Sequence, residues 1–99
     1  MAYQIVWTTN ARIDFKKIVD YLISEWSMEI AKKFVAECES KIDLIAHFPN
    51  IGIKSEKIIG VHRILITKQN ALYYLVEKNK ITLLNFFDLR QNPDKDLLK

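Results

Sequence analysis

Four basic side chains in the second half of the sequence are the residues best suited to chemistry on an anion: Lys54, Lys57, Arg63 and Arg90. Arginine in particular forms paired hydrogen bonds with phosphate oxygens. Residues 49–99 carry nine Lys and Arg against five Asp and Glu, whereas residues 1–48 carry six against seven. This asymmetry suggests an anionic partner for the second half, although a scattered, solvated set of basic residues has the same signature.

The pair His62-Arg63 interrupts an apolar, strand-like run, IIGVHRILI. Because side chains alternate between the two faces of a strand, His62 and Arg63 should lie on opposite faces. An arginine in such a run must reach solvent or a partner, since an unpaired buried charge is costly. Two interpretations stay open: an ion pair with Asp88 on another strand, or a basic group on an exposed sheet face.

The other reactive residue types fit structural roles. Cys38 lies on an apolar helical stripe, where we expect a buried, inert thiol. His47 falls at the predicted C-terminus of a helix, where an imidazolium is mildly favourable. The sequence has no Gly-rich phosphate loop, no pair of cysteines and no His spacing typical of a metal site, so we expect no metal and no cofactor.

The overall composition predicts one globular domain over residues 1–99. A single cysteine excludes an internal disulfide, and the opening MAYQIVWTTN lacks the layout of a signal peptide. No apolar run approaches the ~20 residues that a membrane span needs. We therefore expect a cytoplasmic protein with no membrane partner.

Two helices should position the residues of the first half. After a short strand over Tyr3–Thr8, one apolar stripe recurs at helical spacing, followed by a second stripe that ends near His47 before Pro49. Ser27 separates them and can cap the second helix. The stripes predict an antiparallel helical hairpin over Asn10–His47; they consist of Ala11, Phe15, Ile18, Leu22 and Trp26, then Ala31, Phe34, Val35, Cys38, Ile42 and Ile45.

Three strands should follow the loop FPNIGIKSEK, namely Ile58–Thr67, Ala71–Glu77 and Ile81–Asp88. Their short connectors predict an antiparallel meander. The expected fold class is therefore α+β in the order β-α-α-β-β-β. The helical hairpin would pack on one face of a mostly antiparallel four-stranded sheet.

The motifs IVWTTNARIDFKKIVDYL, FPNIG, VHRILI and LYYLVEKNKITLLNFFDLRQNP, in this order, resemble those of the RelE/ParE toxin superfamily. These proteins are the toxins of type II toxin–antitoxin modules, often called plasmid stabilisation proteins. The resemblance covers about Tyr3 to Pro93 and is closer to the ParE-like branch, chiefly through the ending FDLRQNP. It implies a small toxin that is neutralised by a cognate antitoxin protein on a separate chain.

Two activities occur in this superfamily, and the resemblance implies one of them. ParE-like members bind and poison DNA gyrase, and we expect this function because the chain has no His or Tyr after Asp88. RelE-like members instead cut mRNA on the ribosome without a metal, using acid, base and phosphate-binding side chains. If this chain were such an endoribonuclease, its candidate catalytic residues would be Lys54, Glu56, Lys57, His62, Arg63 and Arg90. An inactive scaffold that still binds its antitoxin is a third possibility.

The resemblance also implies where the partners would bind. The target would contact a basic surface that includes Arg63, Arg90, Gln91, Asn92 and Lys95. The antitoxin would lie along apolar grooves and edge strands, with aromatic residues as anchors. The candidates for these anchors are Trp7, Tyr21, Trp26 and Tyr73, all of which could instead belong to the core.

Overall fold

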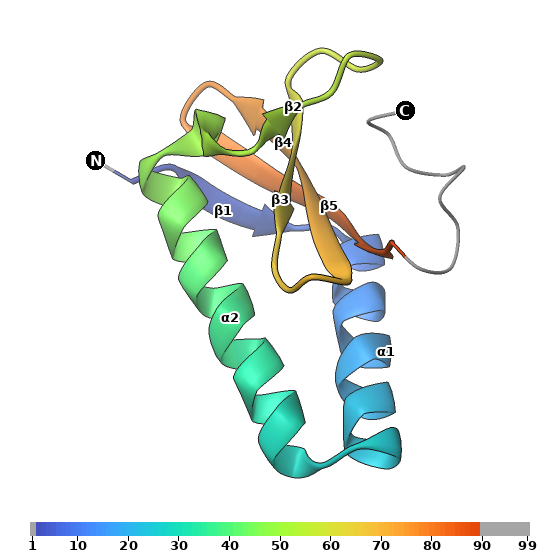
Figure 1. Ribbon diagram of the computed structural model, residues 1–99. Coiled ribbons are helices and arrows are strands. Elements are labelled where there is room, and N and C mark those ends of the chain that lie inside the picture. The colour runs from blue at the N-terminus through green and yellow to red at the C-terminus, as the bar shows by residue number, and fades with distance from the viewer. Residues whose placement is uncertain (1, 90–99) are drawn as a thin grey trace.

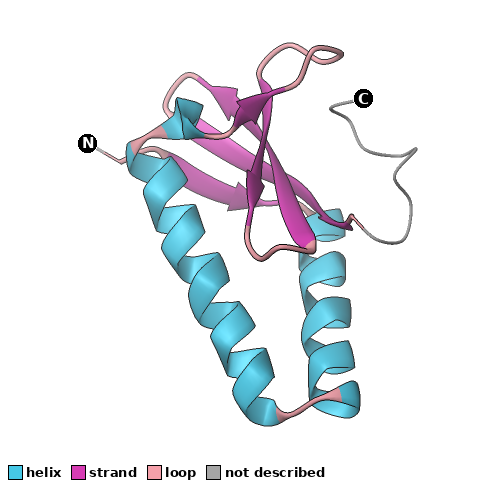
Figure 2. Cartoon of the chain, viewed as in Figure 1, coloured by secondary structure: helices cyan, strands magenta, loops and turns pink. Residues whose placement is uncertain are grey.

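A helical hairpin crosses one face of a five-stranded sheet in the computed structural model, which describes residues 2–89 (Figure 1). The two helices are packed side by side, and their far ends extend beyond the sheet (Figure 2). The elements in chain order are β1 (Gln4–Trp7), α1 (Thr9–Glu25), α2 (Met28–His47), the 3-10 helix η1 (Pro49–Ile51), β2 (Ile53–Lys54), β3 (Val61–Leu65), β4 (Asn70–Glu77) and β5 (Lys80–Asp88).

Both helices begin at the side-chain caps that their sequences offer. The Thr8 hydroxyl accepts a hydrogen bond from the backbone N–H of Ala11, and the Ser27 hydroxyl accepts one from Ile30. Such caps satisfy backbone donors that a helix leaves free at its first turn. The second helix ends at His47, two residues before Pro49, as predicted. No helix within residues 2–89 has the length and hydropathy needed to cross a membrane.

The sheet has the strand order β1-β5-β4-β3-β2 and is antiparallel except for β1, which runs parallel to β5. The predicted α+β class and the antiparallel meander are confirmed. The predicted count of four strands is wrong, because Ile53 and Lys54 pair with Arg63 and His62 and form a fifth, two-residue strand. Sequence periodicity cannot reveal a strand this short.

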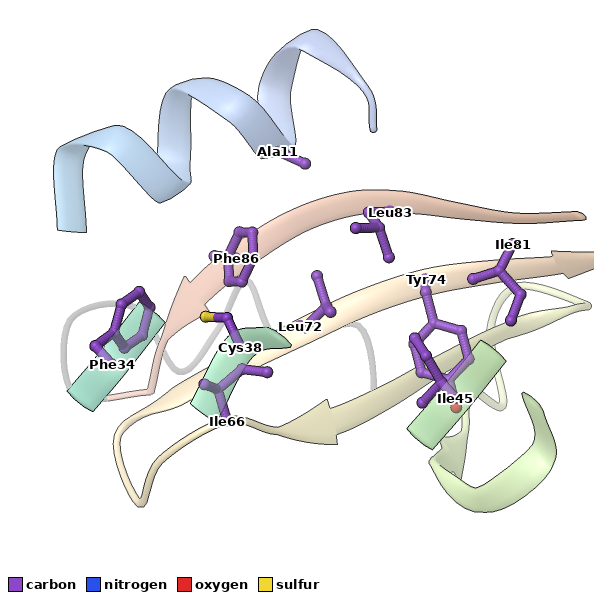
Figure 3. Packing of buried hydrophobic residues seen from close by; sticks show 10 residues of the cluster. All are labelled: Ala11, Phe34, Cys38, Ile45, Ile66, Leu72, Tyr74, Ile81, Leu83 and Phe86. Atoms are coloured by element: carbon purple, nitrogen blue, oxygen red, sulfur yellow. The ribbon is translucent and has the colours of Figure 1, made fainter. Parts of the chain in front are cut away.

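The core lies between the hairpin and the sheet. Figure 3 shows side chains of α2 pointing toward those of β4 and β5, with the Cys38 sulfur inside the cluster. An aromatic group joins four elements, since the ring of Phe15 lies 5.5–5.9 Å from three other rings, those of Trp7, Phe34 and Phe86. Apart from Trp26, which is exposed, the predicted apolar stripes supply the core contacts, and the buried members include Ala11, Ala31, Phe34, Cys38 and Ile45.

Two side chains complete the edge of β5 where β1 stops. β1 ends at Trp7, opposite Leu83, so the backbone groups of β5 beyond that point lack a neighbouring strand. The Thr8 hydroxyl donates to the carbonyl oxygens of Leu83 and Leu84, at 2.7 and 3.0 Å. The Asp14 carboxylate accepts from the Phe86 N–H at 3.1 Å. The start of α1 thus takes the place of a strand, which fixes the helix on the sheet.

Candidate functional site

The candidate catalytic residue His62 is a packed core residue. It is only 7% exposed, and its ring stacks on Tyr74 with the ring centroids 5.5 Å apart and the planes 19° from parallel. Its Nδ1 lies 3.3 Å from the Gly60 carbonyl oxygen. An imidazole held in this way is poorly placed to exchange protons with a large substrate.

Arg63 lies on the opposite face of the sheet from His62, as the alternation predicted. Its register partner on β4 is Tyr73, whereas Ile64, the next residue of β3, packs against the helix-side core. Asp88 lies opposite Asn70, three residues away from Tyr73 along β4, and lines a groove on the helix side. The register and the groove lining thus place Arg63 and Asp88 on opposite faces of the sheet, which does not favour the predicted Arg63–Asp88 pair.

The remaining described candidates lie at the end of β2 and in the loop that follows it. Lys54 pairs in register with His62, and Glu56 and Lys57 follow in the loop; all three are exposed. Within residues 2–89, the candidates are thus divided between a buried position, a half-buried position on the opposite sheet face and solvent-exposed positions from Lys54 to Lys57. No cluster of His, Cys, Asp and Glu in this part of the chain could hold a metal ion.

Four predicted residues of the target-binding surface lie outside the described residues. They are Arg90, Gln91, Asn92 and Lys95, which follow β5 in the sequence. Of that set, the structure places only Arg63. The target-binding surface therefore stays a prediction.

A concave surface lies between the helical hairpin and the turn that joins β3 to β4. We call it the hairpin groove; its volume is about 540 Å³ and its lining comes from Asp14, Lys17, Ile18, Tyr21, Leu22, Trp26, Ile30, Gln69, Asn70, Phe86 and Asp88. A second hollow of about 480 Å³ shares Leu22, Ile30, Gln69 and Asn70 with it. Together they form one continuous depression across the hairpin.

Two aromatic residues stand exposed on the wall of the hairpin groove. Tyr21 is 50% and Trp26 is 68% exposed, although large aromatic side chains usually lose most of their surface in a folded core. Of the other two predicted anchors, Tyr73 is fully buried and Trp7 packs against the core. Two of the four aromatic residues are therefore available to anchor a partner.

A carboxylate lies at the floor of the hairpin groove. Burial raises the pKa of Asp14, while the hydrogen bond from the Phe86 N–H and the nearby Lys17 oppose that rise. This carboxylate is committed to the β5 backbone. The lining of the groove therefore combines apolar side chains such as Trp26 and Ile30 with a few polar ones such as Asp14.

Comparison with known proteins identifies the family. Residues 5–93 match the model of the ParE toxin of type II toxin–antitoxin systems, parDE. The chain belongs to the ParE toxin family. A comparison with curated protein sequences finds no match.

Solved structures share the fold of this ParE-family chain at low sequence identity. The chromosomal ParDE toxin–antitoxin system of P. aeruginosa superposes with a TM-score of 0.72 at 19% identity, covering 88% of this chain and 96% of that one. The RelBE2 toxin–antitoxin complex of Mycobacterium tuberculosis gives 0.64 at 17% identity, covering 89% and 99%. The YoeB dimer of Staphylococcus aureus gives 0.59 at 19% identity, covering 86% and 94%. The predicted RelE/ParE-like fold is confirmed.

The hairpin groove is the feature that sequence reasoning missed. The exposed Tyr21 and Trp26 were predicted as possible anchors, but their shared groove was not. It forms because the β3–β4 turn, near Gln69 and Asn70, approaches the helices. A sequence read one segment at a time carries no signal for this approach.

Proposed function

We propose that this toxin inhibits DNA gyrase by binding it, without chemistry of its own, and that a cognate antitoxin neutralises it. Membership of the ParE family over residues 5–93 is the observation that carries the proposal. The positions of the described candidate residues give further support, because His62 is buried on one face of the sheet and Arg63 lies on the other.

The hairpin groove is the proposed antitoxin site. A helical or extended apolar segment of the antitoxin would cover Tyr21 and Trp26 and fill the space above Leu22 and Ile30. Burying exposed aromatic surface supplies most of the free energy of such interfaces. Toxin–antitoxin complexes among the structural neighbours, such as RelBE2 and YoeB-YefM, agree with a protein partner of this kind.

A supercoiling assay tests the target. Purified toxin should inhibit DNA supercoiling by gyrase, and adding the product of the neighbouring reading frame should restore the activity. Charge reversal at Arg63 or Arg90 should weaken inhibition and make it more sensitive to salt, as expected for charged groups at an interface. Intact inhibition by both variants would remove these residues from the target-binding surface.

The alternative is ribosome-dependent mRNA cleavage, favoured by the structural likeness to the YoeB and RelBE2 toxins. A translating ribosome system with a labelled mRNA tests it directly. Cuts that disappear in Arg63→Ala or Arg90→Ala, with supercoiling unaffected, would replace the gyrase proposal. A loss of about 10²–10³ in rate is expected if either arginine stabilises charge in the transition state. A response in neither assay would indicate an inactive, antitoxin-binding scaffold or another target.

A further inference from the structure

An isoleucine stands almost fully in solvent at the end of the sheet opposite the tip of the helical hairpin. Ile59 is 95% exposed, more than any other large apolar side chain within residues 2–89. It lies in the loop over residues 55–60 between β2 and β3, which projects from the sheet in Figure 1. Its neighbour Ile58 is 44% exposed and Ile53, on β2, is 58% exposed.

Hydrogen bonds hold this loop in one conformation. The Ser55 hydroxyl accepts from the backbone N–H groups of Lys57 and Ile58, both at 3.2 Å, and the Ser55 N–H donates to the Val61 carbonyl oxygen at 2.8 Å. The Val61 N–H donates to Ile58 across a four-residue turn. These hydrogen bonds give the loop a defined conformation. Ile59 is therefore exposed because an ordered turn places it in solvent.

Gly60 sets the direction in which Ile59 points. Its φ of +85° is the conformation that a type II turn requires at its third position, which leaves Ile59 at the second position, on the outside. The Gly60 carbonyl oxygen accepts from the Val76 N–H at 2.8 Å, so the turn is fastened to β4. A backbone held in this way loses little conformational freedom on binding, which favours affinity.

The surroundings of the turn are basic. Lys54 and Lys57 flank it, and the hydrogen bond from Val76 to Gly60 brings the β4–β5 turn, with Lys78 and Lys80, to the same end of the sheet. Two glutamates accompany these four lysines, and one of them, Glu77, pairs with Lys80 at 3.7 Å. An apolar tip within a net positive rim is complementary to an apolar pocket with an acidic rim.

We propose that the residue 55–60 loop is an anchor for the target protein, with Ile59 inserted into an apolar pocket that acidic side chains surround. The inference rests on the proposed function, in which the target is gyrase. This loop would add a second contact with a partner protein. It lies at one end of the sheet, and the β3–β4 turn, which forms part of the hairpin groove, lies at the other end. An anionic membrane is the competing partner for an Ile-Lys surface, but two of the six charged residues around this turn are glutamates, which weaken attraction to an anionic surface.

The test uses Ile59→Ser in the full chain, with Ile13→Ser as the matched control. Ile13 is 47% exposed on α1 and does not line the hairpin groove, so Ile13→Ser makes the same substitution at an exposed isoleucine elsewhere. We expect the toxin concentration for half-inhibition of supercoiling to rise about tenfold or more for Ile59→Ser, as for a central interface residue, and to stay unchanged for Ile13→Ser. Antitoxin binding should be equal for both variants, which also confirms that they are folded.

The outcomes separate the inference from the proposed function. If the unmodified toxin does not inhibit gyrase, the proposed function is wrong, and this anchor falls with it. If the unmodified toxin inhibits and Ile59→Ser inhibits equally well, only the anchor is wrong. Co-sedimentation of the toxin with vesicles of anionic phospholipid that is lost in Ile59→Ser, with supercoiling inhibition unchanged, would assign the loop to a membrane instead.

Discussion

At the scale of single residues, the burial of Cys38 determines the reactivity of its thiol. The side chain is 1% exposed, and burial, together with Glu37 and Glu39, raises the pKa of its thiol to about 12 from 9.0. The thiolate is the reactive form of cysteine, so the folded protein should not react with thiol reagents at neutral pH. Labelling in native buffer and in denaturant checks this, and fast native labelling would contradict the buried position.

The same pKa shift predicts a pH dependence of stability. The folded-state pKa lies above the unfolded value, so the folded protein holds a proton that the unfolded chain releases between pH 9 and 12. The free energy of unfolding should therefore fall as pH rises through this window, by about 1.4 kcal/mol per pH unit from this group. Urea unfolding on both sides of pH 9 measures it. Cys38→Ala should flatten this dependence, and an equally steep curve in the variant would assign the effect to other groups.

Position 52 requires glycine because neighbouring atoms leave no room for a Cβ atom, and not because of its backbone conformation. A Cβ atom at this position would lie 2.5 Å from the Tyr74 hydroxyl and 2.7 Å from the Arg63 carbonyl oxygen. The hydroxyl itself accepts from the Gly52 N–H and donates to the Pro49 carbonyl oxygen. We expect Gly52→Ala to lower the free energy of unfolding by about 1–3 kcal/mol, measured by urea denaturation.

Tyr74→Phe supplies the control for that variant. Tyr74→Phe removes the hydroxyl but leaves the Arg63 carbonyl in place. Combining it with Gly52→Ala should therefore recover only part of the free energy of unfolding that Gly52→Ala loses. Full additivity would mean that the hydroxyl is not the obstacle. The FPNIG motif by itself does not indicate this role of its glycine, because the role depends on Tyr74, which is 22 residues away in the sequence.

At the scale of elements, the start of α1 substitutes for a missing strand beside β5. Asp14→Ala leaves the Phe86 N–H without its acceptor, which should cost about 1–3 kcal/mol in a urea unfolding measurement. Asp14→Asn keeps a carbonyl acceptor and should be at least as stable as the original protein at neutral pH. The pKa of Asp14 is raised, so its protonation favours folding, and that contribution is lost as pH rises through the folded pKa. A large loss in Asp14→Asn would show that charge is needed there.

The elements themselves follow from local patterns, and their assembly does not. The two apolar stripes predicted both helices because each stripe faces one core, and Ser27 marked the cap of the second helix. The parallel pairing of β1 with β5 and the short strand β2 could not be predicted from periodicity. Both depend on contacts between segments far apart in sequence, which no window of ten residues contains.

At the scale of the whole molecule, the hairpin groove should be the antitoxin site. Trp26→Ser removes an exposed anchor and should weaken antitoxin binding about tenfold or more while changing stability by less than about 0.5 kcal/mol. Ile13→Ser is again the control, because Ile13 lies outside the groove. Isothermal titration with the product of the neighbouring reading frame measures both. Equal affinities for the two variants would place the antitoxin elsewhere.

For the candidate site, too, some features could be predicted from the sequence and others could not. The types and faces of His62 and Arg63 were predictable, because alternation along one strand is a local property. The burial of His62 was not, since its stacking partner Tyr74 comes from the neighbouring strand. The hairpin groove needs three separate segments at once, which only the folded chain brings together.

The pairing of β1 with β5 has a consequence for the timing of synthesis. The first strand, Gln4–Trp7, has its neighbour in Lys80–Asp88, so it waits unpaired while about seventy intervening residues are made. Contacts this distant in sequence form late, after the local hairpins. The nascent chain can fold its helices early, but we expect it to gain a complete sheet, and with it any inhibitory activity, only as its last strand becomes available.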